Sequence, residues 1–245
     1  MPRDTPGLSL TQSIYERLRA DLLACRLRPG ERLKINELCA SLSVSLGAVR
    51  EALSRLTAEG LVVAEPQRGF RVAPISATEL RDLTEVRIEV ELRCLHRAVE
   101  CGSVEWETAI VAAHHRMIRL PEREPEDPGR VCEAWAVAHA EFHRALVAGC
   151  GSPWLLRLRD TLYAQSERYR RLSIPLARQG RDLAREHRAI MEATVSRDVP
   201  AASELLAEHL RATTLILLDV DTLAEDAAGE GRAGGPANPP DRPQA

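Results

Sequence analysis

Apolar residues recur at helical spacing along most of the chain, and this pattern predicts a mainly α-helical protein. A first helix is expected over residues 11–25, where Ile14, Leu18 and Leu22 lie on one side. Beyond residue 76 the pattern predicts about six helices and no strand, over residues 77–101, 104–119, 129–149, 153–173, 179–197 and 200–223. Helices of this length predict an all-α bundle whose interior can hold a ligand.

One stretch near the amino terminus, residues 35–72, has a different pattern. A short helix is expected over residues 36–41, and Ser45 stands where it can cap a second helix. Residues 61–64 and 70–72 then flank a turn and predict a β-hairpin. Two tightly joined helices followed by a hairpin indicate a winged helix-turn-helix, whose second helix fits the major groove of DNA. The alternative is a structural three-helix module that never contacts DNA.

These patterns divide the chain of 245 residues into four parts. Residues 1–9 are expected to be a disordered arm, because they are few, mostly polar and include two prolines. Residues 224–245 are expected to be a disordered tail, because they lack apolar residues to bury. Residues 10–75 form the predicted winged helix-turn-helix domain, and residues 76–223 the predicted helical domain. Ser76 and Glu79 are spaced as a capping box for the first helix of that second domain.

The charge distribution agrees with a DNA-binding amino-terminal domain, called the head (residues 10–75), and a helical domain of another function, called the body (residues 76–223). Residues 1–75 contain 11 Lys+Arg and 8 Asp+Glu, a net charge of +3, so the remainder carries −6 of the total of −3. Charged residues interrupt every apolar run well short of the ~18 residues of a membrane span, and the sequence has no signal-peptide pattern. We therefore expect a cytoplasmic protein with no membrane partner.

Four histidines occupy positions that favour metal binding. His139 and His143 are four residues apart, so both rings leave one face of one predicted helix. His187 and His209 lie in the next-to-last and last predicted helices, and packing of the bundle can bring them to the same face. Neutral imidazole suits Zn, Ni, Cu or Fe. The alternative is that each histidine is a surface or hydrogen-bonded residue.

The head resembles the GntR family of bacterial transcription regulators. The resemblance covers residues 10–75. The matching segments are LRPGERL at 27–33, VS at 44–45, VREAL at 49–53 and EGL at 59–61, followed by the wing residues Arg68, Gly69 and Val72. It implies binding to double-stranded operator DNA, with contacts at the positions of Arg32, Asn36, Ser45, Leu46, Gly47, Arg50, Arg68 and Gly69.

The start of the recognition helix departs from that family. The usual Ser-Arg-Thr-Pro-Val-Arg is replaced by SLGAVR at residues 45–50. Leu46 cannot donate a hydrogen bond to a base, and Gly47 has no hydroxyl for the DNA backbone. Loss of a bidentate arginine–guanine contact removes about 1–3 kcal/mol of discrimination. We therefore predict an operator that differs from the family's common one at that position, or weaker sequence selectivity.

The body resembles the FadR C-terminal domain, the ligand-binding module of one GntR subfamily. The resemblance covers residues 77–222. The matching segments are EVR at 85–87 with Glu91, FHRAL at 142–146 with GSP at 151–153, EHRAI at 186–190, and EHL at 208–210. In metal-binding members an acidic residue and three histidines hold a divalent ion beneath a small organic acid, and His143, His187 and His209 match those histidines. His139 stands where the family usually has Asp, which favours Zn or Ni over Mn. The same change is compatible with loss of the metal and binding of an anion alone.

Arg87 is the candidate effector-binding residue. The resemblance implies that its guanidinium points into the cavity and holds a carboxylate, whereas spacing alone favours a salt bridge with Glu91 or Glu85. Together these features predict a ligand-responsive regulator. The family resemblance implies a homodimer and a repressor, with residues 76–223 as the domain for effector binding, metal binding and dimerisation. A DNA-binding regulator with a metal-free pocket is the alternative. A metal-dependent enzyme is a more remote one, since Glu141 and Glu186 are expected to leave their helices away from the histidines.

Overall fold

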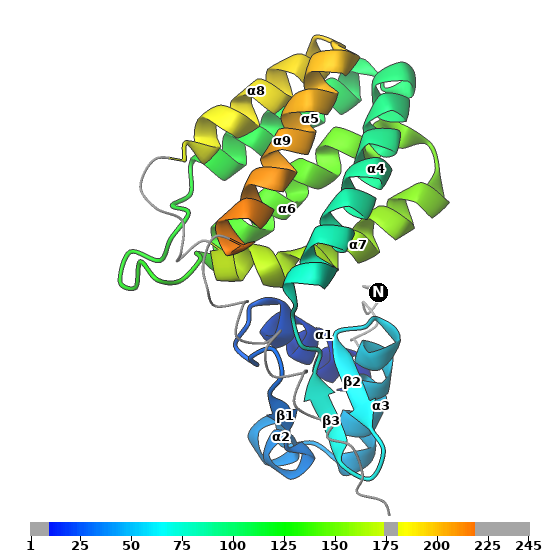
Figure 1. Cartoon of the computed structure of the whole chain (residues 1–245), viewed down its shortest axis with the longest axis vertical. Helices are drawn as coiled ribbons and strands as arrows, with labels where there is room; N and C mark the ends of the chain where they lie inside the picture. Colours follow the sequence, from blue (N-terminus) through cyan, green and yellow to red (C-terminus); the bar gives the residue numbers. More distant parts are fainter. Residues whose placement is uncertain (1–9, 174–180, 219–245) are drawn as a thin grey trace, which may run out of the picture.

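The computed structural model describes residues 10–173 and 181–218, so the predicted arm (1–9) and tail (224–245) lie outside the described residues. Two parts follow each other along the chain, a small head and a helical body, and the long helix α4 leads from one into the other (Figure 1). The head contains α1 (Leu10–Leu23), β1 (Arg32–Leu33), α2 (Ile35–Leu42), α3 (Leu46–Ala58), β2 (Val62–Glu65) and β3 (Gly69–Val72). The body contains α4 (Ala77–Cys101), α5 (Val104–Ile118), α6 (Glu133–Val147), the 3-10 turn η1 (Ala148–Cys150), α7 (Pro153–Ser173), α8 (Leu183–Val195) and α9 (Val199–Leu218).

The head has the winged helix-turn-helix fold that the sequence predicts. The Ser45 hydroxyl accepts a hydrogen bond from the backbone N–H of Ala48 at 3.3 Å and so caps α3. Gly60, with a φ of +73°, allows the chain to leave α3 in the left-handed conformation. The apolar stripe of α3 is fully buried against α1 and the sheet, through Val49, Ala52, Leu53 and Leu56.

The sheet of the head has a third strand that the sequence analysis did not predict. Its order is β1-β3-β2, and all pairs are antiparallel, with Leu33 opposite Phe70 and Val62 opposite Val72. Strand β1 has only two residues, which is too short for an alternating pattern to be recognised. It closes the edge of the wing and brings Arg32 next to the wing tip.

The body is a helical bundle around one large apolar core of α4, α5, α6, α8 and α9 residues. Two predicted helix starts are wrong. The third body helix begins at Glu133 instead of residue 129, because Gly129 lies in a loop closed by an Arg123–Val131 bridge. Helix α8 begins at Leu183 because Asp182 caps it, accepting from the N–H of Arg185 at 2.9 Å. Residues 219–223, the predicted end of the last helix, lie outside the described residues.

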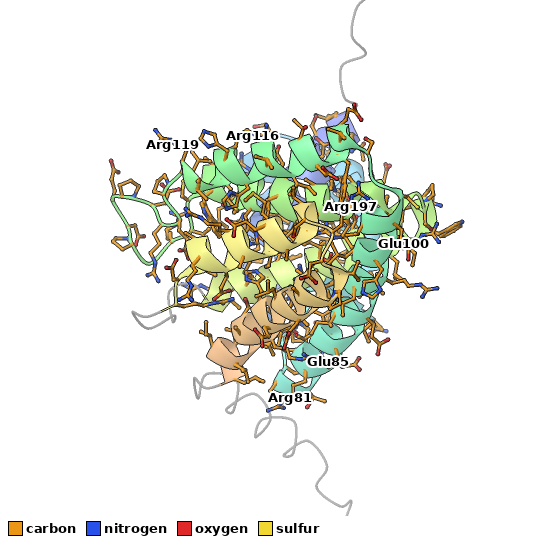
Figure 2. All side chains as sticks on the ribbon, turned by 90° about the horizontal axis from the view of Figure 1, so that it is seen from above. Arg81, Glu85, Glu100, Arg116, Arg119 and Arg197 are labelled. Atoms are coloured by element: carbon orange, nitrogen blue, oxygen red, sulfur yellow. The ribbon has the colours of Figure 1, made fainter. Side chains whose placement is uncertain are left out.

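Charged side chains cover the outside of the bundle. In Figure 2, Glu85 on α4 lies at the same end as Arg81, and it forms a 3.0 Å ion pair with Arg211 of α9. Arg197, at the turn between α8 and α9, pairs with Glu107 of α5 at 2.7 Å. None of the helices that the structure describes is both long and apolar enough to cross a membrane.

Helix α7 runs across the base of the body and carries the contacts to the head (Figure 1). The Gln165 side chain donates to the carbonyl of Glu59 at 2.5 Å, just beyond the end of α3. Arg168 donates to the carbonyl of Ala73 in the linker, and its own carbonyl accepts from the Cys25 thiol at 3.5 Å. The start of α4 is held to the same helix, since Tyr169 donates to Glu79 at 3.0 Å. Helix α6 adds one contact, a 3.3 Å ion pair between Arg26 of the head and Glu133.

Candidate metal and effector site

The structure brings the four predicted histidines into one cluster inside the body. His139 and His143 leave the same face of α6 one turn apart, His187 comes from α8, and His209 from α9. Each ring offers one nitrogen to a group whose members all lie within 4.8 Å of one another. The four side chains are buried, with exposed fractions of 1–5%. This separation is small enough for all four nitrogens to surround a single ion.

Unpartnered nitrogens show that the cluster fits a metal ion. Both ring nitrogens of His143 and Nε2 of His187 are buried without a hydrogen-bond partner among the residues that the structure describes. A buried polar atom without a partner costs about 1–3 kcal/mol, so such atoms in a native core call for an explanation. Burial lowers the pKa of each of the four histidines, which keeps the rings neutral. Neutral imidazole is the form that coordinates a metal.

A carboxylate outside the cluster orients His209. Glu186 Oε2 lies 2.7 Å from His209 Nδ1, so the Nδ1 side is occupied and Nε2 is left for a ligand. Arg181 holds the same carboxylate with two hydrogen bonds of 2.9 and 2.8 Å. Burial raises the pKa of Glu186, but the bonds from His209 and Arg181 outweigh it and lower that pKa to about 2. Glu186 is therefore ionised and accepts hydrogen bonds from both partners.

The prediction that Glu186 lies away from the histidines is wrong. It leaves α8 beside His187 but reaches across to α9, a contact that depends on how the two helices are rotated against each other. Glu141 is exposed on α6, and its nearest ion-pair partner is Arg116 at 3.9 Å. Tyr163 of α7 is a second neighbour that the sequence did not reveal, since its hydroxyl lies 3.2 Å from His139 Nδ1.

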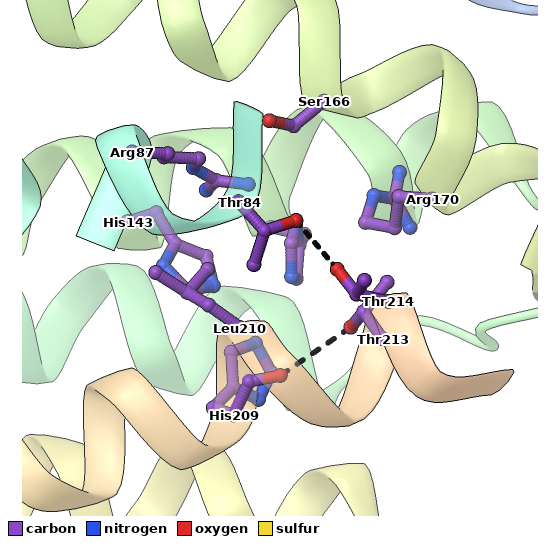
Figure 3. Close-up of a pocket in the computed structure, with 10 residues that line it drawn as sticks. Thr84, Arg87, His143, Ser166, Arg170, His209, Leu210, Thr213 and Thr214 are labelled. Carbon is purple, nitrogen blue, oxygen red and sulfur yellow. Dashed lines mark hydrogen bonds between the residues drawn. The ribbon is translucent and has the colours of Figure 1, made fainter. Parts of the chain in front are cut away.

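A small cavity adjoins the histidine cluster. Its volume is about 30 Å³, and Figure 3 shows side chains of α4, α7 and α9 around it. The lining residues are Thr84, Arg87, His139, His143, Ser166, Arg170, His209, Leu210, Thr213 and Thr214. Ligand pockets usually measure about 300–1,000 Å³, so this cavity is large enough only for an ion or water. An organic ligand needs side chains to move.

Arg87 forms the ion pair with Glu91 that its spacing favours, and it also lies at the cavity wall. Its guanidinium lines the cavity, and it also donates to Glu91 through two long hydrogen bonds of 3.3 Å. Glu91 is 1% exposed and receives two shorter bonds, of 3.0 and 3.1 Å, from Arg159 of α7. Glu91 therefore keeps a charged partner when Arg87 turns away. The other candidate partner, Glu85, pairs with Arg211 instead.

The predicted DNA-contacting residues lie together on the exposed side of the head. Leu46 is 47% exposed in the first turn of α3, and Arg50 is exposed one turn later. At the wing tip Gly69 has a φ of +91°, and the Arg68 carbonyl accepts from Arg32 at 2.8 Å. Asn36, Ser45, Gly47, Arg32 and Arg68 are also exposed, whereas Gly69 is half-buried. The first turn of α3 and the wing tip are therefore both open to solvent.

Two family profiles match consecutive parts of the chain. Residues 10–72 match the bacterial regulatory proteins of the gntR family, and residues 82–212 match the FCD domain. The HTH-type transcriptional regulator BphR of Paraburkholderia xenovorans is 40% identical over 209 residues, 85% of either chain. The HTH-type transcriptional repressor GlaR of Escherichia coli is 34% identical over 200 residues, which cover 80% of this chain and 90% of GlaR.

Solved structures share the fold at lower identity. Escherichia coli McbR/YncC superimposes with a TM-score of 0.69 at 21% identity, covering 86% of this chain and 98% of the other. A putative GntR transcriptional regulator from Rhodococcus sp. RHA1 gives a TM-score of 0.66 at 23% identity, covering 86% and 99%. At this identity the likeness concerns the arrangement of the helices and the winged head.

Proposed function

Because the chain belongs to the GntR family of bacterial transcription regulators and its body is an FCD domain, we propose that it represses its target genes until a small carboxylate binds the body. DNA-binding regulation is the function of the family, and the relatives are regulators, not enzymes. Repression is the role that the name of the relative GlaR states for that protein. Beyond this family function, the proposal includes a bound metal, a small-molecule effector and a dimer.

The proposed metal ligands are His139, His143, His187 and His209. The observation that carries this assignment is His143, whose two ring nitrogens are buried without a partner in the described part of the chain. Four neutral rings favour Zn or Ni over Mn, which prefers carboxylate and water oxygens. When bound, such an ion supplies a Lewis-acidic anchor for one carboxylate oxygen of the effector.

Arg87 is the proposed clamp for that carboxylate. A planar guanidinium matches a carboxylate with two parallel hydrogen bonds. Arg87 can leave Glu91 because its bonds there are long, and because Arg159 keeps Glu91 paired. A movement of this kind also widens a cavity that is too small for an organic acid. The ion pair seen in the structure is then the resting state of the clamp.

Two copies of the chain are proposed to bind a palindromic operator, each with one α3 in a major groove, about one helical turn apart. The effector acts only if it binds the DNA-competent and the incompetent arrangement with different affinity. Helix α7 is the proposed route between the two sites. Ser166 and Arg170 line the cavity, whereas Gln165 and Arg168 hold the head.

Metal content is the first test. Protein purified without a tag or chelator is expected to contain about one equivalent of Zn or Ni per chain, and His143→Ala is expected to lose it. His115→Ala is the matched control, because His115 is an exposed histidine of α5. A wild-type protein that neither contains nor takes up a divalent ion contradicts the metal assignment.

The effector assignment is tested on operator DNA. Arg87→Ala is expected to bind the operator as the wild type does in the absence of any acid, and to need a much higher concentration of a carboxylate for release. Binding is measured by fluorescence anisotropy with labelled operator. An unchanged response of the variant to carboxylates contradicts the role of Arg87 while leaving the metal site untouched.

A further inference from the structure

Four hydroxyl groups form the part of the cavity wall that lies apart from the histidines. They belong to Thr84 of α4, Ser166 of α7, and Thr213 and Thr214 of α9 (Figure 3). Ser166 and Thr213 are half-buried, whereas the four histidine rings are buried. Two of the four hydroxyl-bearing residues are therefore partly open to solvent.

Each of these hydroxyls already donates its one hydrogen to the protein. Thr84 donates to the Leu80 carbonyl at 2.7 Å, so in its 2.7 Å contact with Thr214 the latter is the donor. Ser166 donates to the Leu162 carbonyl at 2.9 Å. Thr213 donates to the carbonyl of His209 at 3.4 Å and accepts from Arg181 at 3.1 Å.

What the hydroxyls offer a ligand is therefore lone pairs. A hydroxyl accepts two hydrogen bonds, so Ser166 and Thr214 retain both acceptor positions, and Thr84 and Thr213 retain one each. Acceptors of this kind repel a carboxylate oxygen and match an O–H or N–H donor. Arg87 offers the opposite, since a guanidinium has donors only. The wall thus has a donor side and an acceptor side.

The positive charge around the cavity selects between the two kinds of donor. Glu91 is shared by two arginines, Arg87 and Arg159. Glu167 is likewise shared by Arg170 and Arg171. Arg159 and Arg171 also pair with Asp160 and Glu133, but no carboxylate is among the described residues that line the cavity, whereas Arg87 and Arg170 are. An ammonium group on the ligand therefore meets like charge at the wall and no anionic partner. A neutral hydroxyl donates to the same acceptors without that repulsion.

We propose that the effector is a compact hydroxy acid whose carboxylate binds at Arg87 and whose hydroxyl donates to the acceptor wall, foremost to Thr214 and Ser166. This inference rests on the proposed carboxylate-binding function and specifies its ligand class. An acid without the hydroxyl leaves these buried acceptors unpaired when it displaces water.

The test uses acids that share a skeleton and differ in one group. Lactate, propionate and alanine form one set, and malate, succinate and aspartate another. Each is titrated into the full-length, metal-loaded protein by calorimetry, with release of operator DNA as a second measurement. The hydroxy member is expected to bind at least about tenfold more tightly than the other two members of its set.

Two variants test whether the acceptor side of the cavity wall causes the preference for the hydroxy acid. Thr214→Val keeps the shape of the side chain and removes the acceptor, so the preference for the hydroxy acid is expected to shrink to a few-fold while the deoxy acid binds as before. Thr161→Val is the control, since Thr161 is an exposed threonine of α7 whose hydroxyl, like that of Ser166, donates to the carbonyl four residues back. Ser166→Ala is expected to act like Thr214→Val.

Failure of the inference and failure of the underlying function give different results. Equal affinity for hydroxy and deoxy acids, or for the amino acid, overturns the hydroxy-acid class while the carboxylate function stands. A preference that survives both Thr214→Val and Ser166→Ala overturns the assignment to the acceptor wall. Binding of none of the acids, by protein that still binds its operator, refutes the carboxylate function itself and this inference with it.

Discussion

Replacement of Glu186 by glutamine is expected to weaken metal binding although Glu186 does not belong to the histidine cluster. In the structure the two carboxylate oxygens accept three hydrogen bonds of 2.7–2.9 Å, two from Arg181 and one involving His209 Nδ1. Glutamine offers one oxygen and one NH₂ group in the same space. It can therefore reproduce only part of this arrangement, whichever way the amide is turned.

The two orientations of the amide fail for different reasons. With its oxygen toward His209, the amide places NH₂ against the Nε–H of Arg181, and two donors face each other. With its NH₂ toward His209, it makes Nδ1 an acceptor and moves the ring hydrogen to Nε2, the nitrogen that faces the cluster. Loss of an outer partner of this kind costs about 10–100-fold in metal affinity. This corresponds to about 1.4–2.7 kcal/mol.

The affinity is measured by competition between the protein and a chromophoric zinc chelator at constant pH. Glu141→Gln is the control, because Glu141 is exposed on α6 and its ion-pair partner Arg116 is 3.9 Å away. Thermal unfolding of the metal-free proteins tests whether either change affects the fold. Equal zinc affinity of Glu186→Gln and the wild type refutes the orienting role of Glu186, and an equal loss in both variants assigns the effect to surface charge.

Three further predictions concern DNA recognition and stability. Leu46→Arg adds a hydrogen-bond donor to the exposed first turn of α3. At one operator position it is expected to change the preferred base, with a difference in binding free energy between bases of about 1–3 kcal/mol. Selection from randomised operators measures this preference, and an unchanged preference contradicts the prediction. Arg68→Ala at the wing tip is expected to lower the affinity about equally for all DNA sequences. The slope of log K against log salt concentration, measured by anisotropy, is expected to fall by about one phosphate contact, and an unchanged slope speaks against such a contact. Gly102→Ala places a Cβ 2.1 Å from Trp106 Cε3 and 2.5 Å from the Ala98 carbonyl, so urea unfolding is expected to show a loss of about 1–3 kcal/mol. Gly47→Ala, with no atom within 4 Å of the added Cβ, is its control and is expected to show no loss.

Local features of the sequence predicted most of the fold. Helical spacing located the body helices, and the cap at Ser45 and the turn before Phe70 located the winged head, because both signals depend on residues a few positions apart. Strand β1 was missed because two residues show no periodicity. The early start assigned to α6 has a similar cause, since apolar spacing continues into a loop whose bridge between Arg123 and Val131 is not local.

The same difference between local and non-local contacts decides which parts of the site could be predicted. His139 and His143 were predicted as a pair because four-residue spacing on a helix places two rings on one face. The partners that orient or surround the histidines, Glu186, Tyr163 and the Glu91–Arg159 pair, come from other helices. Their contacts depend on how each helix is rotated about its axis, which spacing along a single helix does not determine.

The joint between head and body has a consequence for how such regulators diversify. Gln165 and Arg168 both donate to backbone carbonyls, those of Glu59 and Ala73, which every amino acid supplies. These two contacts therefore tolerate changes of side chain on the head as long as the end of α3 and the linker keep their course, whereas the contacts of the Cys25 thiol and the Arg26–Glu133 ion pair depend on head side chains. New operator preferences can arise in the head without redesign of the body. A head grafted from a relative that keeps the same backbone, Cys25 and Arg26 is expected to remain under the control of the effector proposed for this body.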